Sequence, residues 1–385
     1  MIRTFNYPLK LTTRQEESLR DILRACQLVY NAALEQRIQA YRKQKKAITC
    51  FDQFKDLTEL RGYEPDTFGR VAARILRSPL IRLDRAFKGF FRRLKTGQKP
   101  GFPRFRSVDR YDSFTFPEPV TEGNLVRIPG LGDVKFHCYR PLRGVAREAH
   151  VRRTAKGWTL SVVCDLGPAP TKVEVNTSTG IDVGLTHFAT LADGSQVENP
   201  RFYRKSEEIL ARRQRALATK KKGSKSRQRA KRLVGLAHAK IRNQRLDFVR
   251  KLAKSLVFRF DLIAYEDLNI SGMMRSNLAK SINDASWGLF IATMSFRAEE
   301  AGKHMVAVNP RGTSQRCSGC ETVVKKTLSQ REHLCPHCGL KLDRDHNAAI
   351  NIQTLGLSVA DLAPKGMGRP KLVGSPVGPY KQILT

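Results

Sequence analysis

The chain has 385 residues, of which 70 are Lys or Arg and 35 are Asp or Glu, so its formal charge is +35 at pH 7. A chain so far from neutrality repels itself unless a polyanion compensates, and that polyanion is normally nucleic acid. With 41% apolar residues the chain has material for several buried cores, which argues against a small basic ribosomal or nucleoid-type protein without chemistry.

Nothing in the composition indicates a membrane protein. No apolar run approaches the length of a membrane span, and the opening sequence, MIRTFNYPLKLTTRQ, lacks the apolar core of a signal peptide. Four of the eight cysteines follow no pattern, which is typical of reduced thiols: Cys26, Cys50, Cys138 and Cys164. We therefore expect a soluble, intracellular protein with no membrane partner.

The first hundred residues are predicted to form one strand followed by helices. Residues 1–11 read as a strand, and Thr12 or Thr13 is a candidate N-cap for an amphipathic helix. The helical pattern continues to about residue 95 and closes with FKGFFRRLKTGQKPGFPRFRS, where phenylalanines alternate with basic residues. This alternation suits base stacking and phosphate contacts, although core aromatics beside a solvated basic face explain any single Phe equally well. Arg104 and Arg106 are the best nucleic-acid-binding candidates of this segment.

From about residue 111 to 166 the pattern changes to short alternating segments separated by Gly and Pro. This pattern predicts a small antiparallel β domain, which the opening strand could join, with a hairpin around Lys156-Gly157. The following sequence, GPAPTKVEVNTST, reads as a linker.

The second half begins with STGIDVGLTHFATLADG, a strand, a Gly-rich turn and a second strand. Two very basic helices follow, and FRFDLIAYEDLNI then reads as a buried strand that ends in acid. A helix with the sequence SWGLFIATMSFRAEEAGK and the strand HMVAVNP come next, and from about residue 357 we expect a poorly ordered tail. The turn between the basic helices is a candidate phosphate-tracking hairpin, with a solvated loop as the alternative; its candidate contacts are Lys220, Lys221, Lys222, Lys225, Arg227 and Arg229.

Four cysteines have the C-x₂-C-x₁₄-C-x₂-C spacing of a zinc ribbon: Cys317, Cys320, Cys335 and Cys338. Each C-x₂-C turn points two thiolates at one ion, and two turns complete a tetrahedron with no open position. The sequence thus predicts one structural zinc.

Three acidic residues share one placement. Asp182 lies in the strand GIDVG, Glu266 ends the apolar run LIAYE, and Asp345 opens the helix DHNAAINI. An acid at a buried strand is costly unless a cation or a hydrogen bond compensates. Three such acids could hold two divalent ions about 4 Å apart for phosphodiester hydrolysis, and oxygen ligands favour magnesium or manganese. Taken singly, Glu266 could be a surface residue and Asp345 a plain N-cap.

The order strand–Asp, strand–Glu, helix–Asp is what an RNase H-like nuclease fold of the RuvC type needs, so we interpret these three as catalytic. We set aside four other acids, of which the last is the nearest alternative: Asp261, Asp267, Asp284 and Asp343.

These motifs resemble the TnpB proteins of bacterial insertion sequences, which are relatives of the type V CRISPR effector nucleases. The motifs GIDVG, IAYEDLNISGM, CSGC…CPHC and DRDHNAAINI occur in the family's order. The likeness extends to VYNAALEQRIQAY, FKGFF…GFPRFR and SWGLF, and so covers the chain to about residue 355.

The resemblance implies a multidomain α+β and α/β protein. A β-barrel-like wedge domain (residues 1–11 and 111–170) would hold an inserted helical recognition lobe (12–110). A RuvC-like nuclease domain (178–310 and 342–356) would hold the zinc ribbon (311–341), and 357–385 would be a tail.

The resemblance also implies an RNA-guided DNA endonuclease that cuts double-stranded target DNA beside a short flanking motif. Its partner would be a guide RNA derived from the element. We expect a monomer in the bacterial cytoplasm, nucleoid-associated when on DNA. Two alternatives stay open: a nuclease-inactive RNA-guided repressor, and a DNA transposase. Against the transposase, integrases order their carboxylates Asp, Asp, Glu, and this chain has no His-x-His pair.

Overall fold

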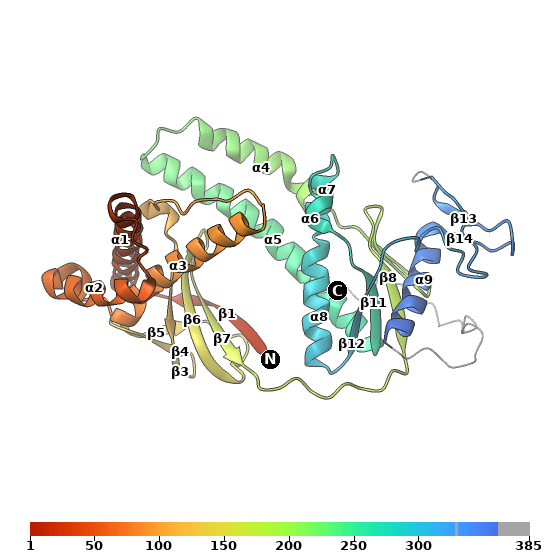
Figure 1. Cartoon of the computed structure of the whole chain (residues 1–385), viewed down its shortest axis with the longest axis horizontal. Coiled ribbons are helices and arrows are strands. Elements are labelled where there is room, and N and C mark those ends of the chain that lie inside the picture. The colour runs from red at the N-terminus through yellow and green to blue at the C-terminus, as the bar shows by residue number, and fades with distance from the viewer. Residues whose placement is uncertain (328–329, 361–385) are drawn as a thin grey trace. The chain divides into compact units, whose positions relative to one another are not determined.

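The computed structural model describes residues 1–327 and 330–360. The chain divides into two compact units, Met1–Pro168 and Ala169–Thr385 (Figure 1). Among the helices of the described part, none is both long and apolar enough to cross a lipid bilayer.

The first unit contains a seven-stranded sheet in the order β2-β6-β7-β1-β5-β4-β3, and every neighbouring pair is antiparallel. The opening strand does join the β region as expected, because its residues 2–8 pair with β7 and residues 9–10 pair with β5. The hairpin at Lys156-Gly157 is confirmed as the turn between β6 and β7. The strands are β1 (Ile2–Lys10), β2 (Ser113–Pro117), β3 (Val120–Glu122), β4 (Leu125–Ile128), β5 (Gly132–Phe136), β6 (Val145–Thr154) and β7 (Gly157–Asp165).

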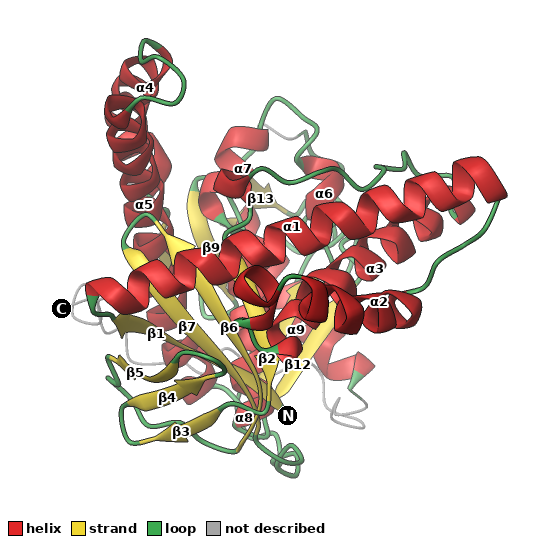
Figure 2. Ribbon diagram, turned by 90° about the vertical axis from the view of Figure 1, so that its left-hand side faces the viewer, coloured by secondary structure: helices red, strands yellow, loops and turns green. Residues whose placement is uncertain are grey.

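Three helices lie against this sheet and share one core with it: α1 (Thr13–Gln44), α2 (Cys50–Tyr63) and α3 (Ala73–Lys95). Figure 2 shows α1 crossing one face of the strands. Thr12 is the N-cap of α1, and its side chain and that of Gln15 exchange hydrogen bonds with each other's backbone N–H in a capping box. The predicted apolar stripe of α1, which includes Leu19, Leu23 and Tyr30, faces this core.

The second unit is built on a five-stranded sheet in the order β10-β9-β8-β11-β12. The first three strands in this order are antiparallel, whereas β8, β11 and β12 run parallel. The strands are β8 (Ser178–Asp182), β9 (His187–Leu191), β10 (Gln196–Glu198), β11 (Leu262–Glu266) and β12 (His304–Val308). Four of these strands lie where the sequence predicts them, whereas β10 was not predicted.

Helices cover both faces of this sheet (Figure 1). One face packs on α5 (Lys225–Arg259) and α8 (Trp287–Glu300), which share a core with Phe188 and Ile263. The opposite face carries α9 (Arg344–Val359). The helix α4 (Phe202–Ala218) forms an antiparallel hairpin with α5, and the short helices α6 (Ile270–Met273) and α7 (Ala279–Ala285) precede α8.

Two glycines allow α9 to lie directly on the sheet. A Cβ atom at Gly180 of β8 would come within 2.1 Å of the Ala349 carbonyl oxygen, and one at Gly356 of α9 within 2.3 Å of the Ala264 Cβ. Both distances are far below van der Waals contact, so only glycine permits this approach. The small residues of α9 therefore do allow tight packing on a sheet, as its sequence suggests.

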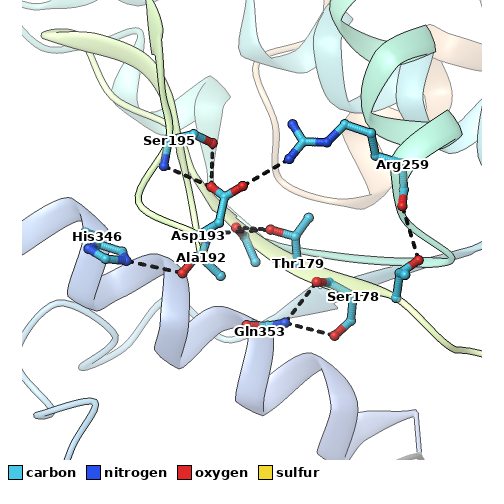
Figure 3. A network of polar contacts seen from close by, with 10 residues as sticks. Ser178, Thr179, Ala192, Asp193, Ser195, Arg259, His346 and Gln353 are labelled. Atoms are coloured by element: carbon cyan, nitrogen blue, oxygen red, sulfur yellow. Dashed lines mark hydrogen bonds and ion pairs between the residues drawn. The ribbon is translucent and has the colours of Figure 1, made fainter. Parts of the chain in front are cut away.

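Polar contacts fasten the same helix to the strand ends (Figure 3). Gln353 donates to both the backbone and the side-chain oxygen of Ser178, each at 2.9 Å, and the His346 ring lies 3.2 Å from the Ala192 carbonyl. Next to them Asp193 pairs with Arg259 at the end of α5 at 3.0 Å. The register of α9 on β8 is thus specified by hydrogen bonds as well as by packing.

Between β12 and α9 the chain forms a small module with one antiparallel pair of strands, β13 (Glu332–Leu334) and β14 (Lys341–Asp343). The expectation of a poorly ordered tail from residue 357 is wrong for its first residues, because α9 continues to Val359. The rest of that predicted tail lies outside the described residues.

Candidate functional site

Two of the predicted carboxylates come together because their strands are neighbours. Asp182 is the last residue of β8 and Glu266 the last of β11, and the parallel register that pairs Ile181 with Tyr265 brings both ends to one edge of the sheet. Carboxyl ends of adjacent parallel strands are the usual place for a site in an α/β sheet.

The third carboxylate reaches this edge on α9. Asp345 lies one helical turn before Ala349, on the same side of the helix, and the Ala349 carbonyl rests on Gly180, two residues before Asp182. The Asp345 Oδ2 atom lies 4.0 Å from the position a Gly184 Cβ would take, just after β8. The close glycine contact thereby sets where Asp345 meets the sheet.

The charges of these three acids oppose one another. Burial, followed by the charges of Glu266 and Asp345, raises the pKa of Asp182 well above its usual range. Burial also raises the pKa of Glu266, although the Thr313 hydroxyl lowers it in part. Neighbouring acids of this kind are stabilised when a cation binds between them, although the oxygens of these three do not all lie within 4.8 Å of one another.

Two arginine side chains partly neutralise the negative charge of these acids. The Arg344 guanidinium donates to Asp345 Oδ1 at 2.9 and 3.0 Å, and Arg331 lies 3.9 Å from its Oδ2. The donor set is oxygen only, which fits magnesium or manganese. Such an ion would compete with the two arginines for Asp345.

The four predicted zinc ligands form one compact cluster. Their sulfur atoms all lie within 4.8 Å of one another, which within residues 1–327 and 330–360 holds for no other group of three or more His, Cys, Asp or Glu ligand atoms. Hydrogen bonds from Thr322 lower the pKa of Cys320 to about 5, which favours its thiolate. At Cys338 the Leu340 N–H acts in the same direction, but burial and the other thiols outweigh it and raise the pKa to about 12. Four sulfurs in this arrangement fit a structural zinc.

Two asparagines that the sequence analysis missed join this module to α9. Asn347 accepts from the Ser318 N–H at 2.8 Å and donates to the Arg316 carbonyl at 2.8 Å. Asn351 donates to the carbonyls of Thr313 and Arg316 at 2.8 and 2.7 Å. Their spacing of four residues on a helix with Ala and Ile neighbours was the available signal, because polar residues on a buried helix face need partners.

Three of the acids that we set aside have structural partners. Asp343 is the N-cap of α9, so the role considered for Asp345 belongs to its neighbour. Asp284 is buried, accepts from the N–H groups of Tyr203 and Arg204 and pairs with Arg245 at 2.9 Å. Asp261 accepts hydrogen bonds from Thr177 and Asn176.

The predicted basic contacts are exposed with one exception. Arg104, Arg106, Lys220, Lys221, Lys222, Lys225 and Arg229 all present exposed side chains. Arg227 is half-buried and donates to the carbonyls of Leu217 and Lys220 at 2.9 and 2.8 Å. It therefore closes the turn between α4 and α5.

Comparisons with known proteins show the family of this chain. Residues 161–277 match a family model described as a probable transposase (OrfB_IS605), and residues 287–352 match the Cas12f1-like TNB domain. A putative RNA-guided DNA endonuclease of Streptomyces pristinaespiralis is 31% identical over 93% of this chain and 90% of its own length. The chain belongs to the TnpB family.

A second TnpB-family relative, the putative RNA-guided DNA endonuclease InsQ of Escherichia coli K12, is 29% identical over 93% of each chain. In structure, the chain resembles the protein of a solved Cas12f1–sgRNA–target DNA complex, with a TM-score of 0.56 at 15% identity over 89% of this chain and 83% of the other. It also resembles the RNA-guided endonuclease Cas_phi3, with a TM-score of 0.50 at 9% identity over 98% and 94%.

The description of one matching family model does not fit the observed secondary structure. A model described as a helix-turn-helix domain matches residues 1–46, but this range forms the strand β1 and the single long helix α1. In this TnpB-family chain the segment contributes to a mixed sheet-and-helix core instead.

Proposed function

We propose that this TnpB-family protein is an RNA-guided DNA endonuclease of a bacterial transposable element, with one RuvC-type metal-dependent active site. The observation that carries the proposal is the meeting of Asp182, Glu266 and Asp345 at one edge of the second sheet. The names of the two full-length relatives support the same activity.

The sheet itself supports an RNase H-like nuclease domain. The sheet has three antiparallel strands followed by the parallel strands β11 and β12, and α9 covers one face. Asp182 and Glu266 lie on central strands of this sheet, and Asp345 lies on the covering helix. We assign residues 178–310 and 342–359 to this domain and 311–341 to the zinc ribbon.

Asp182, Glu266 and Asp345 would hold magnesium or manganese ions, which when bound supply a hydroxide at neutral pH and stabilise the leaving oxygen of the phosphodiester. The carboxylates would bind and orient the cations, and the burial of Asp182 and Glu266, which raises the pKa of both, carries a cost in stability that a cation would relieve. Arg331 and Arg344, displaced from Asp345 by a cation, would remain beside the incoming phosphate.

The remaining parts would bind nucleic acid. In this proposal the sheet of the first unit is the wedge domain and α1–α3 form the recognition lobe, and they grip a guide–target duplex by shape. Exposed Arg104, Arg106 and the α4–α5 turn would contact phosphates. Delegating sequence recognition to base pairing lets so basic a nuclease act on one site instead of on any DNA.

Two alternatives fit less well. A nuclease-inactive RNA-guided repressor would not need three acids at one sheet edge, where burial and then the charges of Glu266 and Asp345 raise the pKa of Asp182. A transposase agrees with the description of the family model at residues 161–277, but the Asp, Glu, Asp order differs from the usual integrase order.

The test is a guide swap on purified ribonucleoprotein. Replacing the guide segment of the bound RNA, with the protein unchanged, should move cleavage to the newly matched site beside the same flanking motif. Asp182→Ala protein with the same RNA is the control for contaminating nucleases. Cleavage that stays at the old site, or equal specificity without RNA, would refute the proposal.

A further inference from the structure

The carboxylate of Glu266 accepts a hydrogen bond from the segment that follows β12. The Thr313 hydroxyl donates to Glu266 Oε1 at 2.6 Å, a short distance typical of a strong hydrogen bond to an ionised acid. The Pro310 carbonyl lies farther from the same hydroxyl, at 3.1 Å. Because a hydroxyl carries one proton, the carboxylate is its main acceptor.

Thr313 is itself held firmly. Its side chain is buried, with 4% of the residue exposed, and its carbonyl accepts from the Asn351 side chain at 2.8 Å. A hydroxyl in such a site has few alternative orientations. It therefore fixes where one oxygen of Glu266 lies.

The same asparagine also binds the first zinc-ligand turn. Asn351 and Asn347 both donate to the Arg316 carbonyl, next to Cys317, and Asn347 accepts from the Ser318 N–H. The amide donors and acceptors of α9 thus hold the segment from Thr313 to Ser318, which carries one zinc ligand and the Glu266 partner. A series of hydrogen bonds therefore connects the residues on either side of Cys317, through Asn351 and Thr313, to the Glu266 carboxylate.

We propose that Thr313 is a positioning residue, which orients Glu266 for the divalent cation, and that the ribbon acts on the nuclease centre through Asn351 and Thr313. This inference rests on the proposed nuclease function. Partners that orient metal ligands from behind typically contribute about 10- to 100-fold to metal affinity. Zinc bound to the ribbon would then support cleavage indirectly, because the ribbon orients Glu266, a ligand of the separate magnesium site.

The test compares Thr313→Val, which keeps shape and removes the hydroxyl, with Thr313→Ser, which restores the hydroxyl. In the zinc-loaded, magnesium-free protein, added Mn²⁺ stabilises the folded state in proportion to its binding. We expect Thr313→Val to need about 10-fold more Mn²⁺ for the same rise in Tm, with zinc content still near one per chain. Thr313→Ser should return to within about two-fold of wild type.

Cleavage by the ribonucleoprotein gives a second measurement. The magnesium concentration for half-maximal cleavage should rise by a similar factor in Thr313→Val and by a smaller factor in Asn351→Leu, while target binding is unchanged. Thr354→Val is the matched control, because its hydroxyl donates to the Ile350 carbonyl within α9.

Three outcomes would overturn the inference. The first is an unchanged Mn²⁺ dependence in Thr313→Val. The second is loss of zinc in that variant, which would show that Thr313 stabilises the ribbon itself. The third is a Thr313→Ser protein that is as impaired as Thr313→Val. If wild-type ribonucleoprotein cuts no guide-matched DNA at any magnesium concentration, the proposed function fails instead. The Mn²⁺ series would still decide the role of Thr313.

Discussion

Asp343 accepts hydrogen bonds from the backbone N–H groups of Asp345 at 2.9 Å and of His346 at 3.2 Å. Two acids that are two residues apart therefore have different roles. Asp343 satisfies the free N–H groups at the start of α9, and the charge of Asp345 contributes more than that of Asp343 to the raised pKa of Asp182.

This division predicts different effects for two alanine substitutions. Asp345→Ala should abolish cleavage while RNA and target binding persist, because it removes a proposed metal ligand. Asp343→Ala should cost about 1 kcal/mol of stability as a lost N-cap and leave most of the cleavage rate. Thermal unfolding, gel-shift and cleavage assays on both ribonucleoproteins measure this, and the reverse ranking in cleavage would show that Asp343 is the ligand.

The raised pKa of Asp182 predicts a gain in stability when its charge is removed. The pKa of Asp182 is higher in the folded protein than in the unfolded chain. The contribution of Asp182 to folding stability is therefore fully present below its unfolded pKa and is lost as the pH rises through its folded pKa. Asp182→Asn should therefore be more stable than wild type at neutral pH without magnesium, and inactive. Each kcal/mol would raise the Tm by about 2–4 °C for a unit of this size.

Thermal unfolding of zinc-loaded protein from pH 4 to pH 8, without chelator, tests this sign. Asp284→Asn is the control, since Asp284 is buried beside Arg245 and its loss should destabilise. An Asp182→Asn protein that melts below wild type at neutral pH would contradict the prediction.

The cysteine cluster predicts about one zinc per chain. Cys335→Ser should lose the ion and with it cleavage, because structural zinc contributes on the order of 10 kcal/mol to the folding of small modules. Metal analysis and cleavage are the measurements. As a control, Cys138→Ser changes an exposed thiol outside the cluster and should leave both unchanged. A Cys335→Ser protein with normal zinc and cleavage would show that the ion is not held by this cluster.

The exposed turn between α4 and α5 predicts a change in salt dependence. Glutamate at Lys220, Lys221, Lys222 and Lys225 should weaken RNA affinity and flatten the plot of log affinity against log salt, since fewer counterions are released. Arg227→Gln should instead lower the Tm, because it removes donors to the carbonyls of Leu217 and Lys220. Salt titrations of RNA binding decide this, and an unchanged slope in the lysine variant would mark the turn as a solvated loop.

Much of the fold follows from local pattern. The stripe of α1, the capping Thr12, the hairpin at Lys156-Gly157 and the strands that end in Asp182 and Glu266 depend on neighbours within a few residues. Periodicity and turn residues record these features directly. The end of α9 is the exception, because the tail was expected from about residue 357 but the helix continues to Val359, with Gly356 packed closely against Ala264.

The sequence by itself determined the kind of chemistry: four cysteines at zinc-ribbon spacing, three acids at strand and helix ends, and a charge that requires a polyanion. Only the tertiary structure decided how these parts act on each other. That Thr313 donates to Glu266 across 47 positions, that Asn351 holds Thr313, and that Arg331 of the ribbon lies 3.9 Å from Asp345 depend on β11, the ribbon and α9 packing together. Hydrogen bonds between residues so distant in the chain leave no periodic signal, because they are set by packing and not by local backbone preference.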